Sequence, residues 1–162
     1  VSNPVDILTS FLIKFVAEES KVSLEKVSKK IVGVSLVDSM RLKNLVKEQF
    51  ATLNKTRPLE TLITDEIEAY ALGEHGPSMV PLMSSIKVKG KKLKELFSDE
   101  LIKNIRDQTI LRGNDIIRLT GASSVYGPAY ASMFMVKQLT QNSEFTLPCS
   151  AWDGKRSIGS LV

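Results

Sequence analysis

The segment that constrains this 162-residue chain most is a loop with the sequence Leu72–Gly73–Glu74–His75–Gly76–Pro77–Ser78, called the histidine loop below. Its glycines and proline disfavour a helix. The loop directly follows residues 67–72, which are predicted as a strand, and a side chain placed there can project into a cleft. His75 is the only histidine, and histidine can exchange protons near neutral pH without a large pKa shift. His75 is therefore a candidate acid–base, although by composition alone a histidine without a chemical role is the commoner case.

Apolar periodicity and capping residues predict helices and strands on both sides of this loop. Helices are expected over residues 4–19, 36–50, 99–112 and 122–139, and strands over residues 31–34, 59–63, 67–72, 83–88, 144–151 and 157–162. Ser35 and Ser98 are the expected N-caps of the second and third helices. Gly113 is expected to loosen or end the third helix, and Asp153–Gly154 to form the last turn.

The composition is that of an ordinary soluble globular domain, with 43% hydrophobic and 25% charged residues. No apolar stretch reaches the roughly 18 residues that a membrane helix needs, and no signal peptide is recognisable. The lone Cys149 excludes an intrachain disulfide and suits a reducing compartment, so a cytoplasmic location is expected. With one cysteine and one histidine, most zinc sites are also excluded, and we expect no metal.

The net charge of +4 is concentrated in one lysine run. The run consists of Lys87, Lys89, Lys91, Lys92 and Lys94. No aromatic residues interleave with it and no nucleic-acid recognition motif accompanies it, so a solvated loop is the preferred interpretation and no nucleic-acid partner is expected. A modestly positive domain also suits small anionic substrates.

Two further places hold candidate functional residues. Asp38 and Arg41 are spaced i, i+3, so they share one face of the expected second helix. The planar guanidinium of Arg41 matches a carboxylate in bidentate fashion, and Asp38 could orient an imidazole. On spacing alone a surface ion pair is the preferred interpretation. Asn3, directly before Pro4, is by local chemistry a helix cap or turn residue.

Four segments resemble segments of malate and lactate dehydrogenases, in that family's order and with similar separations. They are Ser2–Asn3–Pro4–Val5–Asp6, Val37–Asp38–Ser39–Met40–Arg41, the histidine loop, and Ser123–Ser124–Val125–Tyr126–Gly127–Pro128–Ala129. The resemblance spans essentially the whole chain. It departs from the family pattern in two places: Pro77 stands where the family has an aspartate, and no G-x-G-x-x-G dinucleotide motif is present.

The resemblance implies a role for each candidate. His75 would exchange a proton with the substrate oxygen, Asp38 would pair with His75 and stabilise its protonated form, and Arg41 would clamp the substrate carboxylate. Asn3 would contact the reacting oxygen or the nicotinamide, and Ser123 or Ser124 would line the substrate pocket. The cofactor would be NAD, bound mainly by a nucleotide-binding half outside this chain.

The resemblance also implies an architecture and an activity. The fold would be α+β, a twisted and mainly antiparallel sheet with packed helices, truncated at both ends. Residues 1–32 would be the tail of a dinucleotide-binding domain, and residues 33–162 a substrate-binding domain that is incomplete at its C-terminus. The parent protein would be a homodimer or tetramer that interconverts a 2-oxo acid and an L-2-hydroxy acid, with malate favoured over lactate. The fragment alone would be inactive.

Two interpretations from other classes stay open. An NAD- and metal-dependent glycosidase of related fold would need metal ligands that include a cysteine and a histidine, but Cys149 lies far from His75 in the sequence. A non-enzymatic binding module could use the lysine run and would bind polyanions in a salt-sensitive way, but it would leave the four matched segments unexplained.

Overall fold

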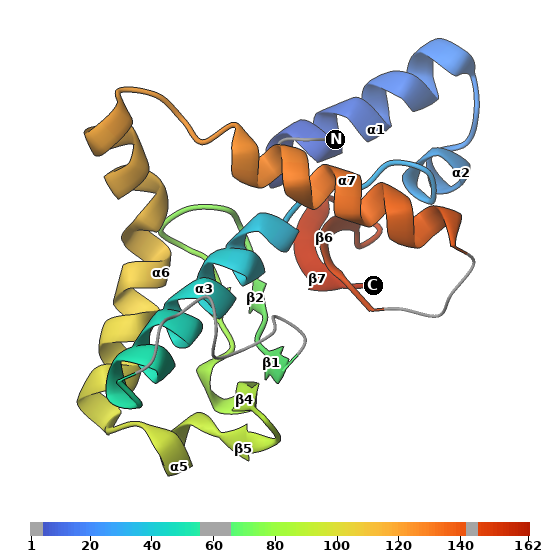
Figure 1. Ribbon diagram of the computed structural model, residues 1–162. Helices are drawn as coiled ribbons and strands as arrows, with labels where there is room; N and C mark the ends of the chain where they lie inside the picture. Colours follow the sequence, from blue (N-terminus) through green and yellow to red (C-terminus); the bar gives the residue numbers. More distant parts are fainter. Residues whose placement is uncertain (1–4, 56–65, 142–145) are drawn as a thin grey trace.

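The computed structural model describes residues 5–55, 66–141 and 146–162 (Figure 1). Its helices and small antiparallel sheets confirm the predicted α+β class. The helices are α1 (Asp6–Ser20), α2 (Leu24–Ser28), α3 (Leu36–Leu53), α5 (Leu93–Leu96), α6 (Asp99–Thr120) and α7 (Tyr126–Thr140), with one 3-10 turn, η2 (Met83–Ser85). The strands are β1 (Ile67–Glu68), β2 (Ala71–Leu72), β3 (Val80–Pro81), β4 (Lys87–Val88), β5 (Lys91–Lys92), β6 (Pro148–Trp152) and β7 (Ser157–Leu161).

The strands of the described residues form three small antiparallel sheets rather than one large sheet. Their orders are β1-β4-β5, β2-β3 and β6-β7. The single strand predicted over residues 67–72 is divided, because its first part pairs with β4 and its last part with β3. The histidine loop is therefore the connection of the β2–β3 hairpin. The strand predicted over residues 83–88 begins as the 3-10 turn and becomes extended only at its end.

One hydrophobic core lies where α3 packs on β1, β4, α5 and α6. Leu42, Leu45 and Val46 on α3 are at most 2% exposed, and they face the strand and helix residues Ile67, Ile86, Val88, Leu93 and Ile105. Burying a side chain of this size stabilises a fold by about 1.5–3 kcal/mol. This aliphatic region holds α3 in place over most of its length.

A second core forms at the N-terminal end of α3. Leu36 and Val37 pack there with Val34, with Ala131 and Met135 of α7 and with Cys149 of β6. Figure 1 shows α3 running from this junction with α7 and β6 toward α6 and α5. The first turn of α3 therefore sits between the two halves of the molecule.

The α6 helix differs from its sequence prediction at one end. Ser98 is its N-cap as predicted, and its Oγ accepts a hydrogen bond from the Leu101 N–H. Gly113 does not end the helix, which continues to Thr120 and stops at Gly121, where φ is +73°. An interior glycine costs only about 1 kcal/mol relative to alanine, and the packing of Ile105 against α3 offsets a penalty of that size.

Other boundaries shifted by a few residues. The helix expected over residues 122–139 begins at Tyr126, and residues 31–34 contribute only a single bridge between Gly33 and Ser150. Ser35 stands at the N-cap of α3 but its side chain makes no capping hydrogen bond. The strand expected over residues 59–63 and the predicted site residue Asn3 lie outside the described residues.

The described helices were also compared with what a membrane span requires. Within residues 5–55, 66–141 and 146–162, none combines sufficient length with sufficient apolarity to cross a bilayer.

Candidate active site

The histidine loop is attached to α3 through a single serine. Ser39 lies on the first turns of α3, and its Oγ accepts a hydrogen bond from the Ala71 N–H at 2.8 Å. The same hydroxyl lies 3.3 Å from the Ala71 carbonyl oxygen, to which it donates. This buried contact fixes β2, and so the start of the loop, beside the helical turn that carries Asp38.

Backbone conformation then directs His75 back toward α3. Gly73 and Gly76 have φ values of +81° and +125°, a region that side chains with a Cβ rarely adopt. The two glycines therefore let the chain turn sharply on both sides of the histidine.

Three of the predicted site residues meet in one hydrogen-bonded group. His75 Nδ1 lies 2.7 Å from Asp38 Oδ2, and Arg41 Nη1 lies 3.1 Å from Asp38 Oδ1. The Asp38 side chain is only 5% exposed, against 24% for His75 and 15% for Arg41. The surface ion pair that spacing alone favours is therefore wrong, since this pair is largely buried and includes a third member from a distant segment.

The arrangement favours one imidazole tautomer. An ionised Asp38 can only accept hydrogen bonds, so the proton between the two side chains belongs to His75 Nδ1. The other ring nitrogen, Nε2, can then either carry an exchangeable proton or accept one through its lone pair. A buried carboxylate is costly unless it is paired, and here each oxygen of Asp38 has its own partner.

His75 and Arg41 line one pocket of about 570 Å³. The entry to α7 forms the facing wall, with Ser123, Ser124, Val125, Pro128 and Ala129, and the rest is formed by Val5, Val37, Gly113 and Ile117. The structure thus brings together five of the six predicted site residues: Asp38, Arg41, His75, Ser123 and Ser124. The sixth, Asn3, is not described, but Val5 two positions later reaches the same pocket.

Two pocket residues on α6 were not expected from the sequence. Gly113 and Ile117 are one helical turn apart and face the pocket. A Cβ on Gly113 would lie 3.4 Å from Arg41 Nη1, so the glycine leaves space beside the guanidinium. The available signal was Gly113 itself, in the middle of a long amphipathic helix that it was expected to loosen or end.

The pocket offers a proton-exchanging group, a fixed positive charge and an apolar wall. The imidazole can give or take a proton at one point of a ligand, while the guanidinium can bind a carboxylate a few atoms away. Among the described residues, no group of three or more His, Cys, Asp or Glu side chains could hold a metal ion. Cys149 is buried in the second core and does not line the pocket.

The lysine run lies on the hairpin of β4 and β5 and on α5, away from this pocket. Lys87 pairs with Glu68 at 3.2 Å and Lys89 with Glu66 at 3.7 Å. Lys91, Lys92 and Lys94 are exposed. Two of the five lysines in the run are thus balanced locally by acidic residues near β1.

Comparisons with known proteins bear on the whole chain. The family model described as the lactate/malate dehydrogenase alpha/beta C-terminal domain matches residues 36–157. Malate dehydrogenase 1 of Aquifex aeolicus is 34% identical over 157 residues, which cover 96% of this chain and 42% of that protein. Malate dehydrogenase of Chlorobium phaeobacteroides is 31% identical over 164 residues, with coverages of 99% and 47%.

Solved structures agree with these relatives. Malate dehydrogenase from Plasmodium falciparum in complex with NADH has a TM-score of 0.78 and 27% identity, and covers 98% of this chain and 51% of that one. Malate dehydrogenase from Salinibacter ruber has a TM-score of 0.76 and 26% identity, with coverages of 99% and 49%. The chain spans less than half the length of the two curated relatives named above.

Proposed function

The chain belongs to the lactate/malate dehydrogenase family, and from this premise we propose that it forms the substrate-binding half of an NAD-dependent L-malate dehydrogenase. The observation that carries the proposal is the meeting of His75, Asp38 and Arg41 at one pocket. In this reaction malate and oxaloacetate interconvert by transfer of a hydride and a proton. The chain supplies the groups that orient the acid and move the proton.

His75 is the acid–base of this proposal. In the reducing direction Nε2 donates a proton to the carbonyl oxygen as that oxygen gains negative charge. Asp38, 2.7 Å from Nδ1, keeps the ring oriented and stabilises the imidazolium, as a buried carboxylate does in other acid–base pairs. In the oxidising direction the same nitrogen removes the hydroxyl proton.

Arg41 binds the carboxylate next to the reacting carbon. Its contact with Asp38 uses Nη1, while the guanidinium also lines the pocket and has five N–H donors in all. Because a carboxylate held in this way cannot rotate freely, the neighbouring carbonyl is presented to the imidazole in a fixed orientation. Ser123 and Ser124 line the opposite wall, where their hydroxyls can contact the substrate.

The chain fits NAD only at its reactive end. Val5, Val125 and Pro128 give the pocket apolar surface, as a flat nicotinamide ring requires, and the proposal places Asn3 near that ring. When bound, NAD accepts or supplies the hydride. The sequence contains no G-x-G-x-x-G segment to hold the pyrophosphate, so the proposal assigns that task to a nucleotide-binding half. The family match that begins at residue 36 supports a domain boundary near residue 33.

Malate is preferred to lactate because the named curated relatives are malate dehydrogenases. A lactate dehydrogenase from Eimeria maxima with NADH and oxamate also matches, with a TM-score of 0.77 and 25% identity, so lactate is the second candidate. A cytoplasmic homodimer or tetramer is part of the proposal. Exposed large side chains on α7, including Tyr126 at 90%, Tyr130 and Met133, support a contact with a second subunit.

The direct test is catalysis by the full-length protein that contains this chain. NADH oxidation is followed with oxaloacetate and with pyruvate, and kcat/KM is compared. The proposal expects the higher value with oxaloacetate and its loss in the His75→Asn variant. A higher value with pyruvate would select the lactate alternative, and turnover with neither acid would overturn the proposal. The 162-residue chain alone should show no saturable NADH binding by calorimetry.

A further inference from the structure

A buried carboxylate on α1 lies outside the proposed catalytic group. Asp6 is only 8% exposed, and it stands in the first turn of α1, far in sequence from the histidine loop. Its Oδ2 accepts a hydrogen bond from the Gly159 N–H of β7 at 3.2 Å. Its Oδ1 is buried with no hydrogen-bond partner among the described residues.

Gly159 connects this carboxylate to the histidine loop. The N–H of Gly73 donates to the Gly159 carbonyl oxygen at 3.0 Å. The backbone of Gly159 therefore makes two hydrogen bonds: its N–H donates to Asp6, and its carbonyl oxygen accepts from Gly73. Gly73 lies two residues before His75 in the histidine loop. Ser10 adds a second tie between α1 and β7, because its Oγ accepts from the Ser157 N–H at 2.7 Å.

The contact between β7 and the loop depends on the absence of a side chain at position 159. A Cβ built on Gly159 would lie 2.1 Å from the Gly73 oxygen and 2.9 Å from the Gly73 nitrogen. Both are backbone atoms that cannot move aside without moving the loop. The two backbones thus meet at a closeness that only glycine permits.

The buried surroundings of Asp6 disfavour an ionised carboxylate. Thr9, Ser150 and Ser157 are buried around this interface, and the buried hydroxyls of Thr9 and Ser157 have no hydrogen-bond partner in the described part of the chain. Burial raises the pKa of Asp6, and the nearby Glu74 raises it further, while Ser150, the Gly159 amide and Arg156 oppose that change. Glu74 is the neighbour of His75, so the interface and the loop also interact electrostatically.

From these contacts we propose that Asp6 is a positioning residue for His75, acting through the Gly159 backbone. The inference rests on the proposed function, because it assigns Asp6 a part in placing the imidazole against Asp38. By fixing Gly159, Asp6 fixes Gly73, and Gly73 determines where the loop enters the turn that carries the histidine. Two anchors therefore hold the loop: Ser39 on α3 and Asp6 on α1.

The first experiment compares three variants of the chain by NMR. Asp6→Ala removes the acceptor, Asp6→Asn keeps a carbonyl acceptor, and Ile13→Val is the matched control, since Ile13 is a fully buried residue of the same helix. Asp6→Ala should speed exchange of the Gly73 amide on the order of tenfold, the loss expected from one hydrogen bond, and should shift the His75 ring ¹⁵N signals. Asp6→Asn should restore both.

The control separates positioning from general stability. Ile13→Val should lower the melting temperature while leaving the Gly73 amide and the His75 ring signals as in the wild type. If Asp6→Ala changes the Gly73 and His75 signals no more than Ile13→Val does, the inference is wrong. These signals do not depend on turnover, whereas failure of the proposed function would appear as absence of oxaloacetate reduction by the full-length wild type.

A second measurement keeps the test valid if Asp6→Ala does not fold. In the Glu74→Gln variant, which removes the carboxylate that raises the pKa of Asp6, a pH titration follows the Gly159 and Gly73 amide shifts. Both amides should share a transition with the midpoint of Asp6, whose remaining charged neighbour is Arg156. A Gly159 signal that titrates while the Gly73 signal stays constant would overturn the inference. The effect of Asp6 ionisation would then reach β7 but not the histidine loop.

Discussion

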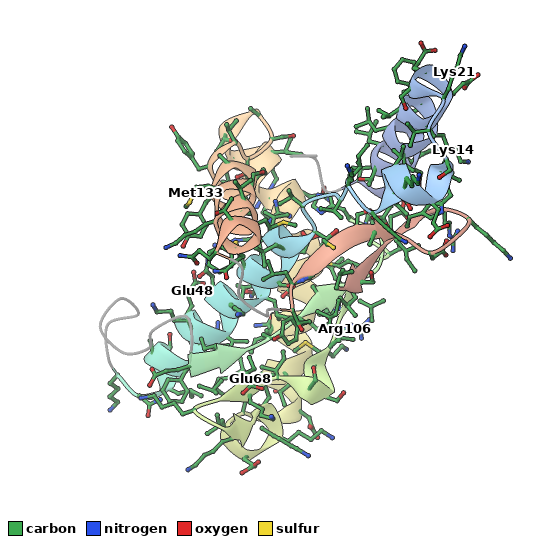
Figure 2. The ribbon with its side chains drawn as sticks, turned by 90° about the vertical axis from the view of Figure 1, so that its right-hand side faces the viewer. Lys14, Lys21, Glu48, Glu68, Arg106 and Met133 are labelled. Atoms are coloured by element: carbon green, nitrogen blue, oxygen red, sulfur yellow. The ribbon has the colours of Figure 1, made fainter. Side chains whose placement is uncertain are left out.

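The region where α3 packs on β1, β4, α5 and α6 is lined by aliphatic side chains, whereas the region where α1 meets β6 and β7 buries hydroxyl groups and a carboxylate. Figure 2 shows that the two regions lie apart: α1, with Lys14 and Lys21, is at the opposite end from Glu68 on β1 and Arg106 on α6. The proposed site lies between the two regions, on the first turn of α3. We expect the aliphatic region to supply stability and the polar region to orient the histidine loop.

The two regions differ because one holds a long helix and the other holds a loop. Apolar contacts stabilise without direction, so they suit the long body of α3. The proposed role of the loop, to present one ring nitrogen of His75, needs directional contacts, and Ser39, Gly159 and Asp38 make such contacts with the loop and with β2. Each such contact is costly if left unpaired, which makes the polar region sensitive to small changes.

The largest expected effect separates chemistry from stability. In the full-length protein, His75→Asn should lower kcat for oxaloacetate by roughly 10²- to 10⁴-fold, the usual contribution of a general acid–base. Its free energy of unfolding should fall by no more than about 1–3 kcal/mol, the cost of leaving one oxygen of the buried Asp38 without its partner. Steady-state kinetics and thermal unfolding of the same sample measure both quantities. A variant that keeps more than a tenth of the wild-type kcat would remove His75 from its proposed role.

The aliphatic region should respond in the opposite way. Leu42 is fully buried in the first core, so Leu42→Ala should lower the free energy of unfolding by about 2–5 kcal/mol. Leu111 on α6 is 53% exposed, and Leu111→Ala is the matched control, with an expected change within about 0.5 kcal/mol. Urea unfolding followed by circular dichroism measures the two. Equal losses of unfolding free energy in the two variants would show that burial in the first core does not determine stability.

Gly113 tests the boundary between the regions. Gly113→Ala should raise the free energy of unfolding by up to about 1 kcal/mol, since alanine favours the helix interior. The new Cβ would lie in van der Waals contact with Arg41, 3.4 Å from Nη1, so it should fill the space beside the guanidinium and raise KM for oxaloacetate. Thermal unfolding of the full-length variant measures the gain in stability, and steady-state kinetics measures the rise in KM. A variant that is more stable and has an unchanged KM would show that the space beside Arg41 is not used by the substrate.

The smallest effect concerns pH in the polar region. Burial raises the pKa of Asp6 above its ordinary value of 3.8, so the folded state favours the protonated acid. The resulting stability is fully present below pH 3.8 and is lost as the pH rises through the raised folded pKa. Asp6→Asn should lack this decline while matching the wild type elsewhere. Melting temperatures of the wild type and of Asp6→Asn from pH 3 to 7 measure this decline. Parallel profiles for the two proteins would contradict the prediction.

The sequence was sufficient for elements with local signals. The N-cap at Ser98, the helix that carries Asp38 and Arg41, and the turn at Asp153–Gly154 all lie where their residues predict them. Each depends on neighbours within a few positions, so each can be inferred without knowing the fold. The resemblance to a known family added the pairing of His75 with Asp38, which no local pattern contains.

Non-local contacts account for the differences. The strand expected over residues 67–72 is divided because β1 and β2 have different partners, β4 and β3, and the sequence does not encode partners locally. Asp6 and Gly159 are 153 positions apart, so nothing near either residue indicates their contact. Gly113 had a local signal, but its interpretation as a helix end was wrong because packing against α3 outweighs its low propensity.

The central claim is that Arg41 and His75 act on one carboxylate ligand. NMR titration of the full-length protein with NADH and tartronate, a hydroxylated dicarboxylate, tests it most directly. Saturable shifts are expected at the Arg41 Nε–H and the His75 ring nitrogens with a single dissociation constant, and they should be lost in Arg41→Gln. Binding that leaves both side chains unshifted, or that persists unchanged in Arg41→Gln, would contradict the claim.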